Sequence, residues 1–231
     1  MAAVALATGL GTVRLEAGEI ITTPSGERVL LEHFILHAGI AADFYEYTDS
    51  TGTRVLHGVY KLIYPGGWIK RSMTYYHGVR DGPFAKWTND AVKEVDGHYK
   101  AGVLHGEIRW YHDSGKVKSE EIFAEGELNG PYVWYYENGR VRERGAYKKG
   151  VLDGPYIEYH ENGRVYLEGS YRNGQLQGVV RLYDQDGTAR QEGVLEKDRI
   201  VGSWTCLMGR DSTGTRRDGC DGKLYFECAC D

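Results

Sequence analysis

The histidines are the first candidates for acid–base or metal chemistry, and the chain contains 8 of them. His57 and His105 occupy the same position of an internal repeat, where other copies carry Asp, Asn or Gln. A position that accepts several small polar residues is typical of a turn rather than of a catalytic group. His112 and His160 share another repeat position but lie two repeats apart, too far to share a metal ion. We therefore expect no catalytic or metal-binding histidine.

The cysteines could hold a metal or form disulfides, and all four lie near the end of the chain: Cys206, Cys220, Cys228 and Cys230. Zinc sites usually contain cysteine pairs about two to four residues apart, and only the last two cysteines come near this spacing. One or two disulfides in an oxidising compartment, free thiols, and a zinc site remain the alternatives. Because the first 205 residues contain no cysteine, the body of the protein does not depend on disulfides.

The carboxylates follow the repeat and alternate with Arg and Lys, so the pattern sets no pair of them apart. Glycoside hydrolysis needs two carboxylates that face each other in one cleft. The chain also lacks a phosphate-binding glycine loop, a nucleophile elbow and a metalloprotease helix motif. The sequence therefore predicts a protein that is not an enzyme and that uses no cofactor.

One group of basic residues stands out: Arg140, Arg142, Arg144, Lys148 and Lys149. It could contact phosphate or anionic lipid, or it could be a solvated strand face. We favour the solvated face, because a few charges without a lipid anchor bind membranes weakly at physiological salt. Membrane contact thus stays a less favoured alternative. The formal net charge of −5 argues against a nucleic-acid partner.

Two features of the sequence bear on the location of the protein. No apolar run is long enough to span a bilayer. The opening residues, MAAVALATGLG, are mildly apolar but follow no Lys or Arg, so we expect the N-terminal segment of a soluble protein, with a cleaved signal peptide as the alternative. A cytoplasmic location, or one within a larger assembly, is favoured over secretion.

The strongest pattern in the sequence is a repeat of 24 residues. Its position 1 is Gly in five copies: Gly78, Gly102, Gly126, Gly150 and Gly174. A second Gly follows at position 5 of each copy. The series continues at Asp198 and Gly202 and, more weakly, back to Arg54 and Gly58, which adds a degenerate copy at each end. Such self-similarity predicts stacked copies of one supersecondary motif.

Each repeat is expected to be one β-hairpin. Position 14 is Gly in four of the five copies and follows Ser, Asn or Asp, as in Asn138-Gly139. Such dipeptides between strand-like runs predict a two-residue turn in which both residues have positive φ. The cross-strand pairs that follow include Tyr132 with Gly145, Tyr156 with Gly169, Tyr135 with Arg142, and Arg181 with Glu192.

This register gives the hairpins two unlike faces. The packed face holds positions 7, 9, 11, 16, 20 and 22, which are mostly aromatic, aliphatic or Gly. The wet face holds position 10 among Arg, Lys and Glu. Position 10 is always aromatic, and its residues are Trp87, Tyr111, Tyr135, Tyr159 and Tyr183. We call these five the position-10 ladder.

The run LEGSYRNGQLQG (residues 167–178) resembles the MORN repeat, in which an aromatic residue, two variable residues and Gly precede a further Gly. The fuller unit YIEYHENGRVYLEGSYRNG resembles the MORN-repeat variant common in bacterial proteins, often labelled an antitoxin component. The resemblance covers roughly residues 54–202, and it departs at Asp198 and at Asn89-Asp90-Ala91, where the turn Gly is missing. Its aromatic positions are Tyr99, Phe123, Tyr147 and Tyr171.

The resemblance implies an all-β fold: an elongated, twisted, single-layer antiparallel sheet with one hairpin per repeat. We expect a β cap at residues 1–53, the repeat array at 54–202, and a Cys-containing cap at 203–231. Caps are needed because an open sheet end exposes unpaired backbone. A Pro24-Ser25-Gly26 turn is expected within the first cap. MORN-like arrays also occur beside lipid-kinase domains and before SET cores, but neither catalytic part is present in this sequence.

The expected function is a non-catalytic structural or protein-interaction scaffold, which binds a protein partner or copies of itself. The alternatives are an antitoxin or immunity-type binder of a partner enzyme and, less favoured, an anionic-lipid adaptor. The candidate partner-binding residues are the position-10 ladder and Arg142, because Tyr, Trp and Arg often anchor interfaces. The other interpretation is that these rings only cover the sheet backbone and the stems of neighbouring Lys and Arg.

Overall fold

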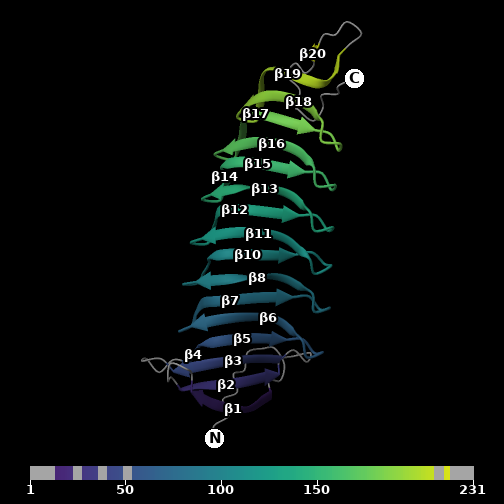
Figure 1. Cartoon of the computed structure of the whole chain (residues 1–231). Helices are drawn as coiled ribbons and strands as arrows, with labels where there is room; N and C mark the ends of the chain where they lie inside the picture. Colours follow the sequence, from purple (N-terminus) through teal and green to yellow (C-terminus); the bar gives the residue numbers. More distant parts are fainter. Residues whose placement is uncertain (1–13, 23–27, 36–40, 49–53, 211–215, 219–231) are drawn as a thin grey trace. The chain divides into compact units, whose positions relative to one another are not determined.

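The computed structural model describes residues 14–22, 28–35, 41–48, 54–210 and 216–218. In these residues every regular element is a β-strand, and the long strands form antiparallel hairpins, such as residues 79–87 with 93–100 and residues 127–135 with 141–148 (Figure 1). The predicted all-β class of repeated hairpins is therefore confirmed. The chain forms two compact units, residues 1–115 (unit 1) and 116–231 (unit 2).

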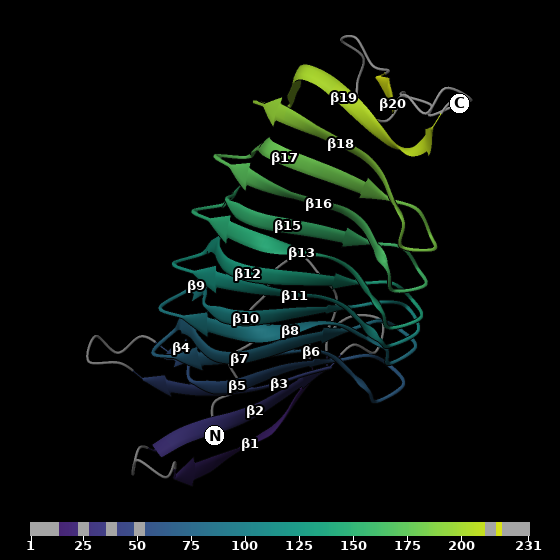
Figure 2. The same cartoon turned by 45° about the horizontal axis from the view of Figure 1, so that its top comes forward.

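Unit 1 is a single layer of antiparallel strands. Its strands are β1 (Arg14–Thr22), β2 (Arg28–Ile35), β3 (Ala41–Thr48), β4 (Arg54–Leu56), β5 (Gly58–Ile63), β6 (Ile69–Tyr76), β7 (Val79–Trp87), β8 (Lys93–Lys100), β9 (Val103–Leu104) and β10 (Gly106–Tyr111). The long strands pair in the order β1, β2, β3, β5, β6, β7, β8 and β10 (Figure 2). The short β4 and β9 extend the pairing of β3 and β8.

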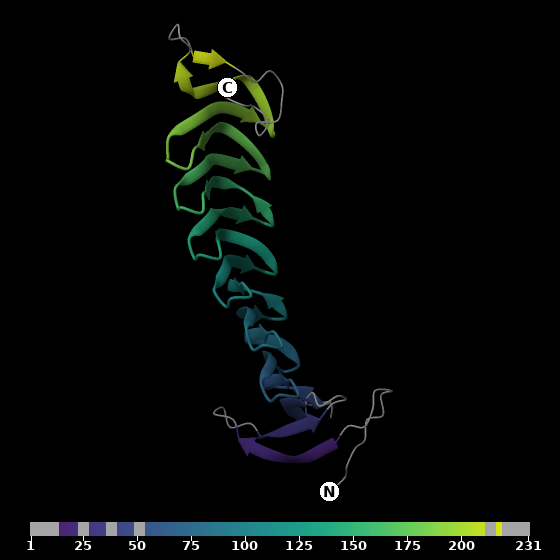
Figure 3. The same ribbon diagram turned by 90° about the vertical axis from the view of Figure 1, so that its right-hand side faces the viewer.

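Unit 2 has the same construction. Its strands are β11 (Val117–Ala124), β12 (Glu127–Tyr135), β13 (Val141–Lys148), β14 (Val151–Leu152), β15 (Gly154–Tyr159), β16 (Val165–Arg172), β17 (Gln175–Tyr183), β18 (Ala189–Glu196), β19 (Arg199–Arg210) and β20 (Arg216–Asp218). The strands curve along their length, as Figure 3 shows for β15 to β18. No second layer of described chain covers either face.

The hairpin turns differ from the predicted two-residue turns. Gly139 has the predicted positive φ of 83°, but Asn138 before it does not have positive φ. The Gly139 amide donates to the carbonyl of Tyr136 (2.8 Å), and the Asn138 side chain accepts from the Arg140 amide (2.9 Å). This is a longer turn that closes on one left-handed Gly, which is another common hairpin connection. The predicted turn type was therefore wrong, although its position was right.

The two-residue turns lie between the repeats instead. At Lys149-Gly150 both residues have positive φ, 50° and 76°, and strands β13 and β14 pair directly around them. Other repeats show the same geometry, with Ala101 before Gly102 and Asn173 before Gly174. The glycine at position 1 is thus explained by the left-handed backbone of these turns.

Position 4 of the repeat supports the same turns. The side chain of Asp153 accepts a hydrogen bond from the amide of Asn173 (3.2 Å), and Asn129 accepts from Lys149 (3.3 Å). His57 has this role toward the amide of His77 (3.5 Å). The polar residues at position 4, His57 included, therefore help to hold the following turn.

The predicted register is right in the strands and wrong beside the turns. Tyr132 lies opposite Gly145, and Arg181 lies opposite Glu192 and forms an ion pair with it. A bulge next to the turn shifts the pairing, so Tyr135 lies opposite Val141 and not opposite Arg142 as predicted. The same shift occurs at three further position-10 residues, Trp87, Tyr159 and Tyr183.

The core lies on the packed face. In unit 2 it is a cluster of aliphatic side chains between 0% and 6% exposed: Leu167, Leu176, Val180, Leu182 and Leu195. Tyr132 is 2% exposed, and its ring lies over Gly145, as predicted. In unit 1, Val95 and Ile108 are buried on this face.

Both predicted departures from the repeat keep its geometry. Asp198 replaces the position-1 Gly with a φ of 63°, and its carboxylate accepts from the amide of Leu176 (2.7 Å). Ala91 replaces the hairpin Gly with a φ of 59°. The turn predicted at Pro24-Ser25-Gly26 and the cysteines Cys220, Cys228 and Cys230 lie outside the described residues. The assignment of the two ends as caps stays a prediction.

Candidate functional site

The position-10 ladder sits at one end of the strands. Trp87, Tyr111, Tyr135, Tyr159 and Tyr183 are the last residues of β7, β10, β12, β15 and β17, and all five are half-buried. Each strand ends there because the hairpin turn follows. The repeat therefore places an aromatic ring at the same edge of every hairpin.

Three ladder hydroxyls donate to a carboxylate at position 19 of the preceding repeat. The pairs are Tyr111 with Asp96 (3.1 Å), Tyr135 with Glu120 (2.8 Å) and Tyr183 with Glu168. Burial, followed by the bond to Asp96, raises the pKa of Tyr111 above its usual value. These phenols therefore connect successive repeats, which is a structural role.

Two ladder residues differ from this pattern. Position 19 is Arg144 before Tyr159, and the guanidinium lies 5.8 Å from the centre of the Tyr159 ring. That arrangement is a cation–π contact in place of a hydrogen bond. Trp87 has no hydroxyl. It is the ladder residue whose ring lines a hollow of the sheet surface.

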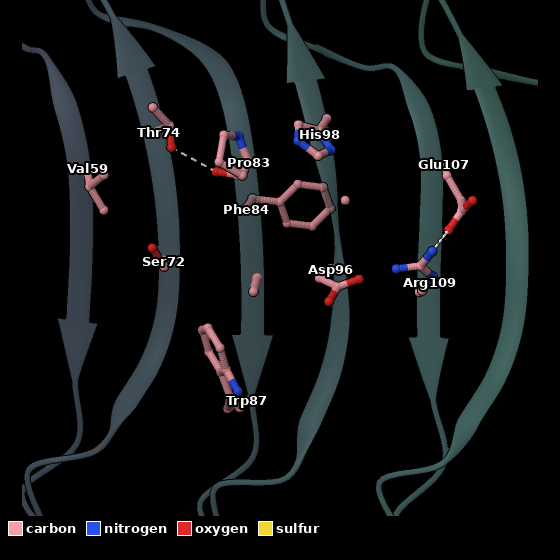
Figure 4. A pocket seen from close by; sticks show the side chains of 12 residues that line it. Val59, Ser72, Thr74, Pro83, Phe84, Trp87, Asp96, His98, Glu107 and Arg109 are labelled. Carbon is pink, nitrogen blue, oxygen red and sulfur yellow. Dashed lines mark hydrogen bonds and ion pairs between the residues drawn. The ribbon is translucent and has the colours of Figure 1, made fainter.

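That hollow is a depression of about 550 Å³ on the wet face of unit 1 (Figure 4). Its lining residues are Val59, Ser72, Thr74, Pro83, Phe84, Ala85, Trp87, Asp96, Gly97, His98, Glu107 and Arg109. Small side chains on β6 and β7 leave the space, with Trp87 beside them and Asp96 on the next strand (Figure 4).

The charged side chains around this depression form hydrogen bonds or ion pairs with neighbouring residues. Asp96 accepts from Lys93 (2.7 Å) as well as from Tyr111, and this contact with Asp96 raises the pKa of Lys93 above its usual value. Arg109 forms an ion pair with Glu107 on the same strand. The depression thus combines an aromatic ring and an apolar floor with both signs of charge, a composition typical of a protein contact surface.

Arg142, the sixth predicted binding residue, is displaced by the bulge. Its guanidinium lies 4.6 Å from the centre of the Trp134 ring and 3.1 Å from a carboxylate oxygen of Glu143. Trp134 belongs to the packed face, so Arg142 does not join Tyr135 on the wet face. The ladder and Arg142 are therefore not brought together.

The remaining basic residues are also divided. Arg140 donates to the carbonyl of Glu161 in the next hairpin turn (3.0 Å), whereas Arg144 contacts the Tyr159 ring. Lys148 and Lys149 are exposed beside the turn between repeats. The group thus has contacts on both faces and at both ends of the strands, which argues against one phosphate or lipid site.

The position-11 residues of unit 2 also have structural contacts. The ring Nε2 of His160 lies 2.9 Å from the carbonyl of Tyr183, and the hydroxyl of Tyr136, at the same position, donates to the carbonyl of Tyr159 (2.6 Å). No group of three or more His, Cys, Asp or Glu side chains among the described residues could hold a metal ion. In the described part of the chain, no helix is long and apolar enough to cross a membrane.

One feature of the packed face was not predicted. Glu143 on β13 lies directly opposite Glu158 on β15. Burial, followed by the charge of Glu143, raises the pKa of Glu158 above its usual value. The signal in the sequence was position 18 of one copy followed by position 9 of the next. The pairing of these two positions can be recognised only when the register between the two hairpins is known.

Comparisons with known proteins identify the repeat. A family model described as MORN repeat variant matches residues 56–75, 104–125, 128–149 and 152–173. A crystal structure of the GtfA/B complex bound to UDP and GlcNAc is similar at 20% identity over 49% of this chain and 22% of that chain, with a TM-score of 0.19. A likeness at this score carries no argument. No curated protein matches the chain.

The last three matched segments start 24 residues apart, in phase with the observed hairpins. MORN repeats generally mediate contact with proteins or membranes, and the repeat itself is not catalytic. The chain is a MORN-repeat protein.

Proposed function

We propose that this protein is a non-catalytic scaffold that binds a protein partner through the wet face of unit 1. The observation that carries the proposal is the depression beside Trp87. Interfaces are commonly anchored by Trp, Tyr or Arg side chains next to a pocket that excludes water. Trp87 and Arg109 supply two of these residue types within one small area.

The contact is placed at Trp87 rather than along the whole ladder. The hydroxyls of Tyr111 and Tyr135 are already bonded to carboxylates within the sheet, so these groups are committed to joining repeats. The Trp87 ring has no such bond to a position-19 carboxylate. Its indole N–H remains suited to a partner acceptor, because interface tryptophans combine a large apolar body with one donor.

A protein partner is favoured over a membrane. Anionic lipid would require a group of basic side chains turned the same way. In unit 2, the guanidinium of Arg142 lies over a packed-face ring, and that of Arg140 is bonded to the next turn. The depression in unit 1 contains both charge signs, which suits a protein surface better than a lipid headgroup layer.

The test compares two tryptophans of unit 1. Trp87→Ser removes the ring beside the depression, whereas Trp110→Ser removes a ring of equal size that is 40% exposed at position 9, on the opposite face. The partner is first captured with the full chain from the native source and identified. We expect its affinity to fall by about tenfold or more for Trp87→Ser and to change little for Trp110→Ser.

Two results would contradict this proposal, one for its site and one for its scaffold role. Equal affinities for wild type and a folded Trp87→Ser variant would place the contact elsewhere. A one-to-one complex in which the captured partner is an enzyme that loses its activity would favour the antitoxin-type alternative over a scaffold.

A further inference from the structure

The depression beside Trp87 lies where one cross-strand pair departs from the repeat. Ser72 at position 19 lies directly opposite Ala85 at position 8, and both side chains are small. At the same two positions the later repeats carry larger pairs, which are Asp96 with Arg109, Glu120 with Val133, Arg144 with Ile157, and Glu168 with Arg181. The backbone therefore accepts bulky side chains here, and a departure that the fold does not require is expected at a functional site.

The charged residues that line the depression are paired with one another or with neighbours. Asp96 accepts hydrogen bonds from Lys93 and Tyr111, and Glu107 forms an ion pair with Arg109. With Lys93 included, the acidic and basic groups are equal in number. A charged occupant would have to compete with these pairs, so charge complementarity favours a neutral occupant.

Neutral hydrogen-bonding groups of the depression remain available to an occupant. The side chains of Ser72, Trp87 and His98 make no hydrogen bond to another described residue. Ser72 and Trp87 lie on the neighbouring strands β6 and β7, and Val59 and Pro83 add apolar surface (Figure 4). A purely apolar occupant would cover these polar groups without pairing them, which costs binding free energy. A ring with one hydroxyl suits this surface better.

The extent of the depression indicates the kind of partner segment that it fits. Its lining residues belong to five strands that pair in succession, β5, β6, β7, β8 and β10 (Figure 4). Four strand spacings of about 4.8 Å cover roughly 19 Å. An extended chain of about six residues has the same length. The depression therefore matches a short linear segment that lies across the strands.

We propose that the depression binds a short extended segment of the protein partner and takes one tyrosine side chain of that segment beside Ala85 and Trp87. This inference rests on the function proposed above and specifies what the partner contributes. The tyrosine ring packs against the Trp87 ring, and aromatic pairs add to the gain from burial. Its hydroxyl pairs with Ser72. Phosphorylation of this tyrosine would bring negative charge near Asp96 and Glu107, so the depression accepts the unmodified residue.

Four peptides test the proposal, each with Gly-Ser-Gly on both sides of a central tyrosine, phenylalanine, lysine or phosphotyrosine. Each peptide is titrated into the full chain while NMR follows the indole N–H signal of Trp87, which is assigned by its loss in Trp87→Phe. We expect the tyrosine peptide to shift this signal and to bind about tenfold or more tightly than the lysine and phosphotyrosine peptides, with phenylalanine between them. A tyrosine peptide that leaves the signal unmoved, or that is not the tightest binder, would overturn the proposal.

A variant that fills the depression provides the second test. Ala85→Ile adds volume without charge and copies Ile157, which occupies the same position of the repeat in unit 2. It should weaken binding of the tyrosine peptide and of the captured partner by about tenfold or more. The matched control, Val133→Ile, enlarges position 8 outside the depression and should change neither affinity. If Ala85→Ile does not fold, Ser72→Ala decides, because it should abolish the preference for tyrosine over phenylalanine.

The variants also separate this inference from the function on which it rests. If Trp87→Ser weakens binding of the captured partner but a folded Ala85→Ile does not, the inference about the tyrosine segment is wrong and the scaffold contact at Trp87 stands. If Trp87→Ser leaves the affinity for the partner unchanged, the proposed function itself is wrong.

Discussion

The hydroxyl of Tyr135 donates a hydrogen bond to the carboxylate of Glu120, 2.8 Å away and 15 residues earlier in the chain. The bond joins one repeat to the one before it, and Tyr111 and Asp96 repeat the arrangement in unit 1. Where the described hairpins lie side by side in one layer, contacts between successive hairpins supply much of the stability. The position-10 tyrosines that make this bond are therefore explained by the fold before any partner is considered.

The first prediction concerns this bond. Tyr135→Phe removes only the hydroxyl and should lower the free energy of unfolding by about 1 kcal/mol, because a half-buried carboxylate loses a donor. Tyr159→Phe is the matched control, since Arg144 contacts its ring, and should change stability less. Denaturant unfolding measures both variants. Equal effects would show that the Tyr135–Glu120 bond contributes nothing specific.

The second prediction concerns Ala91. It has a φ of 59° at the hairpin position where four other repeats carry Gly. A left-handed backbone costs an L-residue about 1 kcal/mol, and the entropy of Gly in the unfolded chain offsets part of the gain. Ala91→Gly should therefore stabilise the protein by roughly 0.5 kcal/mol.

Gly139 provides the reverse experiment. A Cβ there would meet no atom within 4 Å, so Gly139→Ala tests backbone strain without crowding. It should destabilise by about 1 kcal/mol, and Gly139→Val by more. A lower melting temperature for Ala91→Gly, or an unchanged one for Gly139→Ala, would contradict the assignment of these two turns.

The third prediction concerns the contact between Gly145 and Tyr132. A Cβ added at Gly145 would come within 2.9 Å of Cε1 of Tyr132, whose ring is 2% exposed. Gly145→Ala should therefore cost roughly 1–3 kcal/mol through crowding of a packed ring. Tyr132→Val, which copies Val180 at the same position, should reduce this cost in the double variant. An additive double variant would mean that the two residues do not compete for space.

The fourth prediction is a pH dependence. The pKa of Glu158 in the folded protein lies above its usual value, because of burial and then of Glu143. The folded state therefore holds this proton to higher pH than the unfolded state, and the contribution of Glu158 to stability falls as pH rises through the folded pKa. Below the unfolded pKa the penalty is absent. Glu158→Gln should be more stable than wild type at neutral pH, with a difference that shrinks on acidification. A constant difference in free energy would contradict this.

Much of the fold follows from the 24-residue period, because Gly and aromatic residues recur where strands start and end. The turn types did not follow. Asn-Gly suits both a two-residue turn and a longer turn closed by one left-handed Gly. The pair Lys149-Gly150 is a two-residue turn, although Lys rarely has positive φ, and no residue type marks its first position. The strict Gly at position 1 was the available signal.

The bulge was the other missing feature, and it decided the position of a predicted site residue. The extra residue of a bulge carries no mark in an alternating pattern, so Arg142 was placed beside Tyr135. In the structure it contacts Trp134 and Glu143 on the other face. The pairing of Glu143 with Glu158 could not be predicted for a related reason. It joins two hairpins, and the sequence does not give the register between them.

The most direct test of the scaffold function is site-specific photo-crosslinking to the captured partner. A photoreactive phenylalanine analogue replaces Trp87 in one full-length sample and Trp110 in another, which compares two positions on opposite faces of unit 1. The proposed function predicts a covalent adduct with the partner from position 87 and little or none from position 110. An adduct from position 110 alone, or none from position 87 while the complex still forms, would contradict it.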